Sequence, residues 1–162
     1  MAEHVLVLGG GLAGVAAALR LGDEGVDVTL VDRNDYHQFQ PLLYQVASSQ
    51  LPVEDIARPH RTIFQGYPSV TVLTADVAAA TLSERRLVLA DGQTLTGSHV
   101  VVAAGARPNF FGVPGAAEHA FPLYSVADAE RLRRHLQQLL QEAMDGEGPG
   151  DPSTLDVVVV GG

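Results

Sequence analysis

The residues best suited to chemistry stand near the start of the chain, where Gly9, Gly11 and Gly14 have the spacing G-x-G-x-x-G. An aliphatic run, residues 5–8, precedes them, and residues rich in Ala and Leu follow from Leu12 onward. This pattern predicts a short buried strand that turns through glycines into a helix. The first N–H groups of such a helix are unpaired, and together with the positive end of the helix dipole they favour a pyrophosphate.

Each glycine has its own expected role in such a turn. Gly9 permits the tight turn, Gly11 has no side chain to keep phosphates away, and Gly14 lets the helix press against the strand. A second aliphatic run, residues 26–31, ends in Asp32, close to the ~20-residue distance at which an acid accepts hydrogen bonds from ribose hydroxyls and repels a 2′-phosphate. We therefore predict a dinucleotide site; the alternative is a tight structural turn followed by an ordinary surface aspartate.

Composition narrows the possible functions of the chain. Its 162 residues suffice for one domain of common size, and the net charge of -9 argues against a nucleic-acid surface. There is no cysteine, which excludes disulfides, thiolate nucleophiles and cysteine zinc sites within the chain. The six histidines are scattered without metal-ligand spacing. We predict no metal site and no catalytic side chain, and we find no apolar run of the ~18 residues needed to span a bilayer.

The middle of the chain predicts an α/β fold: a Rossmann-like parallel sheet with an inserted antiparallel β-meander. Residues 70–73 are expected to form a sheet strand, and the meander strands are expected at residues 75–82, 86–90 and 94–95, with a hairpin at Asp91-Gly92. The aliphatic run of residues 99–105 predicts a strand buried on both faces. Small residues at its carboxyl end, Ala103, Ala104 and Gly105, allow a ligand to approach closely.

Further elements are expected around this sheet. Residues 42–47 predict a helix with Pro41 in its first turn, which either packs on the sheet or lies along a bound flat ring system. Residues 53–64 predict a short amphipathic helix, interrupted by Pro59, whose charged residues form a solvated face. A long helix is expected to begin at a cap, Ser125 or Asp128, and to end near residue 144. We expect Phe110 and Phe111 to be buried.

The end of the sequence repeats its beginning. After an acidic loop at residues 145–153, residues 155–160 are mostly aliphatic and Gly161-Gly162 follow. We interpret this as the first strand and glycine turn of a second nucleotide site in a longer protein. The alternative is an end strand added to the first sheet.

Taken together, these features resemble the flavoproteins that bind two dinucleotides, which have two glycine-rich turns with a meander and an Ala-Ala-Gly strand end between them. The stretch VTLVDRNDYHQFQPLLYQVA at residues 28–47 resembles type II NADH dehydrogenases, the single-chain, non-pumping NADH:quinone oxidoreductases. Residues 109–115 and 127–133 are also similar to that family. The resemblance implies an FAD-binding domain over residues 1–115. Residues 116–162 would then be a connecting helix and the first strand of an incomplete NAD(P)H-binding domain.

The resemblance also implies a set of cofactor contacts. The glycine turn would cradle the FAD pyrophosphate, Asp32 would bind the adenosine ribose, and Arg33 and the Val77 backbone would lie beside adenine. The 40–42 segment would approach the flavin, and the strand end would pass near the pyrophosphate or ribityl chain through its backbone, because Ala104 replaces the family's usual threonine. The full set is Gly9, Gly10, Gly11, Leu12, Ala13, Gly14, Asp32, Arg33, Gln40, Pro41, Leu42, Val77, Ala103, Ala104 and Gly105.

The implied activity is hydride transfer from NADH to FAD, followed by electron transfer to a quinone. This needs no proton-transferring side chain for the hydride step. We expect a cytoplasmic protein, possible homodimers, and peripheral contact with the inner face of the cell membrane only through a later part of the protein. The 162-residue chain alone is expected to have no turnover and at best weak FAD affinity.

Three other interpretations of the function remain open. Sulfide:quinone oxidoreductases share the fold but need redox cysteines, and none occurs in the 162 residues. Ferredoxin or rubredoxin reductases would lack the FQPLLY pattern of residues 39–44. A non-catalytic nucleotide-binding or redox-sensing module is the third reading.

Overall fold

The chain folds into nine strands and several helices, and the computed structural model describes residues 3–145 and 157–160. The strands are β1 (His4–Leu8), β2 (Asp27–Asp32), β3 (Tyr36–Gln38), β4 (Ala57–Pro59), β5 (Val70–Thr74), β6 (Val77–Thr81), β7 (Arg86–Leu89), β8 (Thr94–Thr96) and β9 (His99–Val102). The α-helices are α1 (Leu12–Asp23), α2 (Leu43–Ala47), α3 (His60–Ile63), α4 (Ala116–His119) and α5 (Val126–Met144). The 3₁₀ turns are η1 (Gln40–Leu42), η2 (Val53–Asp55) and η3 (Leu82–Glu84).

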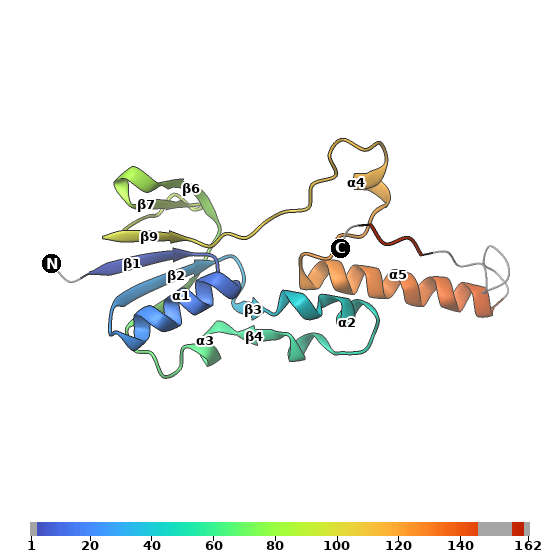
Figure 1. The fold of residues 1–162 in the computed structure, drawn as a ribbon, viewed down its shortest axis with the longest axis horizontal. Helices are drawn as coiled ribbons and strands as arrows, with labels where there is room; N and C mark the ends of the chain where they lie inside the picture. Colours follow the sequence, from blue (N-terminus) through green and yellow to red (C-terminus); the bar gives the residue numbers. More distant parts are fainter. Residues whose placement is uncertain (1–2, 146–156, 161–162) are drawn as a thin grey trace.

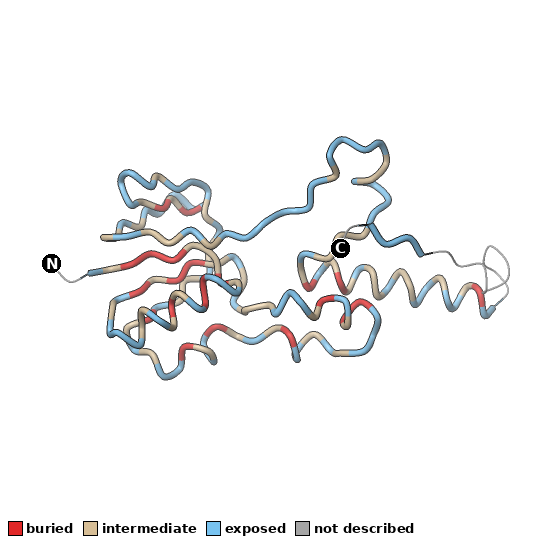
Figure 2. The backbone as a smooth tube through the Cα atoms, in the orientation of Figure 1, coloured by how far each residue is buried: buried red, intermediate tan, exposed pale blue. Residues whose placement is uncertain are grey.

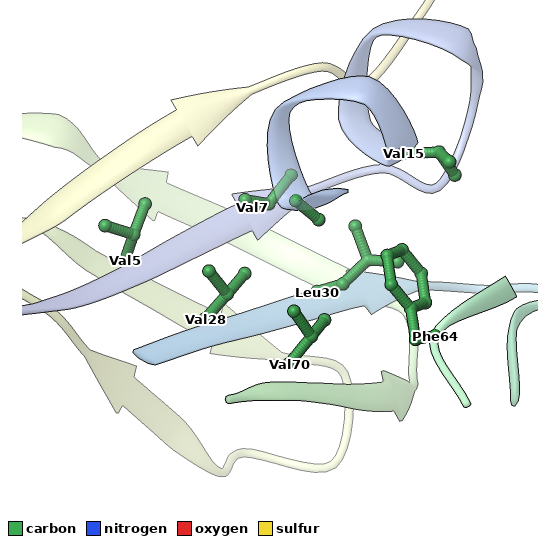
Figure 3. Close-up of a cluster of buried hydrophobic side chains, with 8 residues drawn as sticks. Val5, Val7, Val15, Val28, Leu30, Phe64 and Val70 are labelled. Carbon is green, nitrogen blue, oxygen red and sulfur yellow. The ribbon is translucent and has the colours of Figure 1, made fainter. Parts of the chain in front are cut away.

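A parallel sheet in the order β5-β2-β1-β9 forms the centre of the first half of the molecule (Figure 1). Because side chains alternate along a strand, Val5 and Val7 of β1 face one side of this sheet and Leu6 faces the other. The first side packs against α1 through Val15 and against Phe64, as Figure 3 shows. The predicted strand at residues 5–8 and the helix from residue 12 are therefore confirmed.

An antiparallel meander, β6-β7-β8, covers the other face of the sheet. Leu87 and Leu89 of β7 are buried against Leu6 and Val31. The predicted hairpin is present: Gly92 has φ +89°, which a side chain would strain, and its N–H donates to the carbonyl of residue 89 at 3.0 Å. The predicted α/β fold with its inserted meander is confirmed. We call the parallel sheet, α1 and the meander the sheet unit.

A second group of elements lies beside the sheet unit (Figure 1): the β3-β4 ribbon, α2 and α5. We call it the helical unit. Leu43 and Val46 of α2 pack against Val126 and Ala129 of α5. Of the two predicted caps of α5, Ser125 is the N-cap, and its hydroxyl accepts the N–H of Asp128 in a reciprocal capping box.

The prediction for residues 53–64 was wrong in part. No continuous helix forms there, because Ala57–Pro59 instead pairs as strand β4 with β3, in antiparallel register. The charged residues Glu54, Asp55, Arg58 and Arg61 are exposed as predicted, but His60, which was grouped with them, is only 1% exposed. The mixture of charged and apolar residues in this segment does not indicate a partner strand, and the partner β3 lies about twenty residues earlier in the chain.

Two burial predictions were also wrong. Strand β9 lies at an edge of the four-stranded sheet, and Val102 is 54% exposed, so this strand is not buried on both faces. Phe111 is 85% exposed in the loop after β9, although Phe110 is half-buried. An aliphatic run indicates a sheet strand but does not indicate whether a further strand lies beside it.

The last part of the chain was expected to form a strand. Residues 157–160 belong to no strand, and their valines are exposed. The rest of the predicted acidic loop and of the second glycine turn falls at residues 146–156 and 161–162, outside the described residues. Within the described parts of the chain, no helix is both long and apolar enough to cross a membrane.

Candidate nucleotide-binding site

The glycine turn between β1 and α1 is as tight as the sequence predicts. Gly9 has φ +101°, and a Cβ added there would overlap the carbonyl oxygen of Ala103 at the end of β9. A Cβ added at Gly14 would overlap the carbonyl oxygen of Gly9, so the helix packs directly on the turn. Backbone hydrogen bonds of 2.8 Å from Gly9 to Val31 and from Ala103 to Leu8 tie the turn to β2 and β9. The predicted structural roles of Gly9 and Gly14 are confirmed.

The amino end of α1 is open. A Cβ added at Gly11, the N-cap residue, would meet nothing within 4 Å. Among the described residues no side chain caps this helix end, and the first turn contains no acidic residue. Leu12 and Ala13 are exposed at the same place. The N–H groups of this first turn are thus free to bind an anion that approaches the bare backbone of Gly11.

Asp32 lies at the carboxyl end of β2, beside the turn. One carboxylate oxygen, Oδ2, accepts the N–H of Gly10, and Oδ1 accepts the N–H of Asn34 at 2.7 Å. An ionised carboxylate has about four acceptor positions, so about two remain for hydroxyl groups of a ligand. Asp32 is half-buried and has no basic side chain bonded to it in the part of the chain that the structure describes.

A cavity of about 300 Å³ opens where the carboxyl ends of the parallel strands meet. This volume is at the lower end of the range for small-molecule sites, roughly 300–1,000 Å³. Six of the predicted contact residues lie together in its wall: Gly9, Asp32, Arg33, Val77, Ala104 and Gly105. The wall contains both charge signs, since Arg33 pairs with Asp76 (Nε to Oδ1, 3.7 Å). Open α/β sheets bind ligands at this edge.

The remaining predicted contacts lie outside this cavity. Ala103 contributes the backbone that packs on Gly9, and Gly10 is buried within the turn itself. Gln40 and Pro41 are exposed on η1, and the amide of Gln40 donates to the carbonyl of Tyr124 at 3.4 Å. Leu42 packs on the edge of the helical core. Their expected position beside the flavin stays a prediction.

Sequence reasoning missed several residues of the site. Ala106 and Arg107 line the cavity after β9. More unexpected are two histidines that reach the glycine turn from other segments, His37 of β3 and His60 of α3. A signal for them was present, because position 10 of the G-x-G-x-x-G pattern is unconstrained and yet holds a third consecutive glycine.

Comparison with known proteins agrees with this geometry. The family model described as pyridine nucleotide-disulphide oxidoreductase matches residues 3–162. The chain belongs to this family. Within it, the chain is 33% identical over 150 residues to the type II NADH:quinone oxidoreductase Ndh of Mycobacterium tuberculosis, an alignment that covers 91% of this chain and 32% of that protein.

Solved structures show the same fold. The sulfide:quinone oxidoreductase of Aquifex aeolicus matches with a TM-score of 0.79 and 23% identity, over 86% of this chain and 33% of that one. The NDH2 of Plasmodium falciparum, solved in complex with NADH, matches with a TM-score of 0.78 and 21% identity, over 89% and 30%. The chain spans about a third of the length of the curated oxidoreductases that it matches. The fold alone does not separate these two proteins, since the TM-scores are nearly equal.

Proposed function

We propose that this chain is the N-terminal, FAD-binding part of a type II NADH:quinone oxidoreductase. The main support for this proposal is the cavity at the strand ends, because the glycine turn, the acid at the end of β2 and the backbone after β9 meet there. The sequence similarity to the mycobacterial enzyme supports the NADH and quinone specificity of the complete protein.

The residues present fit the adenosine diphosphate half of FAD. The open backbone at Gly11 and the uncapped N–H groups of α1 would hold the pyrophosphate. Asp32 would accept hydrogen bonds from the ribose hydroxyls, and Arg33 and Val77 would lie beside the adenine. The bound flavin would supply the redox chemistry, accepting a hydride from NADH and passing electrons to a quinone. The part described here would bind and orient that cofactor.

A second candidate is a sulfide:quinone oxidoreductase, because the fold matches the Aquifex enzyme as well as it matches the Plasmodium NDH2. The two candidates differ in the electron donor. The test is to purify the complete gene product that contains this chain, record its flavin absorption band, and add either NADH or sulfide without oxygen. We expect NADH to bleach the band and a quinone analogue to restore it. Bleaching by sulfide alone would favour the second candidate, and absence of a flavin band would contradict both.

The role of Asp32 in FAD binding can be tested with a matched pair of variants on one strand. Asp32→Asn removes the charge at the carboxyl end of β2, while Asp27→Asn removes the charge from an exposed residue at the other end. Since hydrogen bonds to charged groups contribute about 1.5–3 kcal/mol, we expect roughly ten- to hundred-fold weaker FAD binding for D32N. D27N should bind like the wild type. Equal affinity of D32N and wild type would contradict the assignment of the ribose site.

A further inference from the structure

One buried imidazole lies directly beneath the glycine turn. His60, the first residue of α3, is 1% exposed, and its Nε2 lies 3.2 Å from the carbonyl oxygen of Gly10. The Nδ1 of His37, from β3, lies 3.0 Å from the same oxygen. A carbonyl oxygen can only accept, so both ring nitrogens must be donors. This fixes the hydrogen of His60 on Nε2 and that of His37 on Nδ1.

The two imidazoles determine where the next N–H points. The carbonyl of Gly10 and the N–H of Gly11 belong to one planar trans peptide, in which they point in opposite directions. Two donors that hold the carbonyl on the inner side of the turn therefore direct the Gly11 N–H outward. The space next to Gly11 is open, because a Cβ added to this residue would meet nothing within 4 Å.

The same imidazole explains why position 10 is glycine. Gly10 does not have a left-handed φ, so its backbone conformation does not exclude a side chain. A Cβ added there would instead overlap the His60 ring at Cε1 and Nε2. Gly10 and His60 lie fifty residues apart in sequence and form a closely packed pair.

The other nitrogen of His60 has no partner. Its Nδ1 is buried and makes no hydrogen bond among the described residues. A buried unpaired nitrogen is costly, and an aliphatic side chain would fill this space without one. Compared with an aliphatic side chain, the imidazole therefore adds the hydrogen bond from its Nε2 to the carbonyl oxygen of Gly10.

We propose that His60, together with His37, is a positioning residue of the phosphate-binding turn, which holds the Gly10 carbonyl and so directs the Gly11 N–H at the cofactor pyrophosphate. In this role both histidines act through the Gly10 carbonyl and not by contact with the cofactor. The inference rests on the proposed FAD site, and it adds two residues that act on that site through the backbone.

The first experiment measures FAD affinity of the complete apoprotein by fluorescence titration, with the melting temperature of each apoprotein recorded alongside. His60→Leu keeps the bulk but loses the donor, whereas the side-chain amide of His60→Gln can place an N–H near the position of Nε2. We expect about ten-fold weaker FAD binding for H60L, and recovery of most of that loss in H60Q. His119→Leu, at an exposed histidine, is the control and should bind like the wild type.

The outcomes separate the two proposals. Wild-type protein that binds no FAD would overturn the proposed function. Wild-type protein that binds FAD no more tightly than H60L, or H60Q that is no better than H60L, would overturn the positioning role. If H60L does not fold, the half-buried His37 tests the same carbonyl: His37→Leu should weaken FAD binding and His37→Asn, whose amide lies near Nδ1, should restore it.

A second experiment tests the packed pair. Gly10→Ala should weaken FAD binding strongly in the wild type because the new methyl group meets the His60 ring. In a His60→Ala background the ring is gone, and the same substitution should have an effect at least about ten-fold smaller, a coupling typical of residues in contact. Equal effects of G10A in both backgrounds would show that His60 does not constrain position 10.

Discussion

The sheet unit and the helical unit differ in how completely they bury their apolar residues. In the sheet unit, Leu6 and Leu30 face opposite sides of the sheet, and each is 0% exposed. In the helical unit, α5 is buried near its start at Val126 and Ala129 and near its end at Ala143, but its large side chains Leu140 and Met144 are 54% and 79% exposed. Figure 2 shows this contrast along the chain.

The reason for the difference is the length of the covering elements. The sheet has α1 and Phe64 on one face and the meander on the other, so both faces are covered. Helix α5 has 19 residues and α2 has five, which at 1.5 Å per residue correspond to roughly 28 Å and 8 Å. The short helix can cover only part of the long one. The proposed nucleotide site is accordingly built on the unit that is packed from both sides.

The largest expected loss of stability comes from a substitution in the core of the sheet unit. Leu30→Ala should lower the free energy of unfolding by about 3–5 kcal/mol, because it removes a fully buried side chain and leaves a cavity. Leu140→Ala, at an exposed position of α5, should change it by less than about 0.5 kcal/mol. Urea unfolding measures both. A comparable loss in L140A would mean that the far half of α5 is covered in solution, and the contrast between the units would disappear.

A smaller loss of stability is expected when the contact between α1 and the glycine turn is disturbed. Gly14→Ala adds a methyl group against the carbonyl of Gly9, and such overpacking costs about 1–3 kcal/mol, more than the roughly 1 kcal/mol that alanine gains in a helix. Gly66→Ala is the control, since a Cβ there would meet nothing within 4 Å. The melting temperatures of the two variants give the comparison, and a stabilised G14A would show that the turn can move away from the helix.

The N-cap of α5 should contribute less to the free energy of unfolding than either of these two contacts. Ser125→Ala removes the capping hydroxyl, so the helical unit should lose about 1 kcal/mol of stability. Ser83→Ala, at an exposed serine in η3, should have no measurable effect. Hydrogen exchange of the first α5 amides would detect the loss locally. Faster exchange in the sheet unit as well would show that the two units unfold together.

The smallest effect concerns Tyr36, which lies in β3 where the chain passes from the sheet unit to the helical unit. Burial, and then the charges of Asp35, Asp32 and Glu130, raise the pKa of Tyr36 above its ordinary value of 10.0. Tyr36 therefore loses its proton at lower pH in the unfolded chain than in the folded one. The stability linked to the protonated Tyr36 is fully present below pH 10 and is lost as pH rises through the pKa of the folded state.

Tyr36→Phe should therefore weaken the alkaline loss of stability, whereas Tyr44→Phe, at an exposed tyrosine of α2, should not. Urea unfolding at neutral and alkaline pH provides the measurement. An unchanged pH dependence in Y36F would indicate that Tyr36 is solvated and does not pack against the core of the helical unit.

Much of the fold and part of the site could be predicted because their signals are local. The strand, glycine turn and helix at the start follow one another in sequence, and the hairpin at Gly92 depends on its own backbone conformation. Asp32 was identifiable because it ends the second strand at the usual distance from the glycines. The same reasoning failed for β4, whose partner β3 lies in another part of the chain.

The sequence by itself determined that a glycine-rich turn precedes α1 and that an acid ends β2, since short-range sterics and strand periodicity suffice for both. Only the tertiary structure decided that β9 lies at an edge, that Ala104 to Arg107 line the cavity, and that His60 is buried beneath Gly10. Such pairings depend on which distant segments pack together, and the free energy that selects them comes from burial over the whole core rather than from any local pattern.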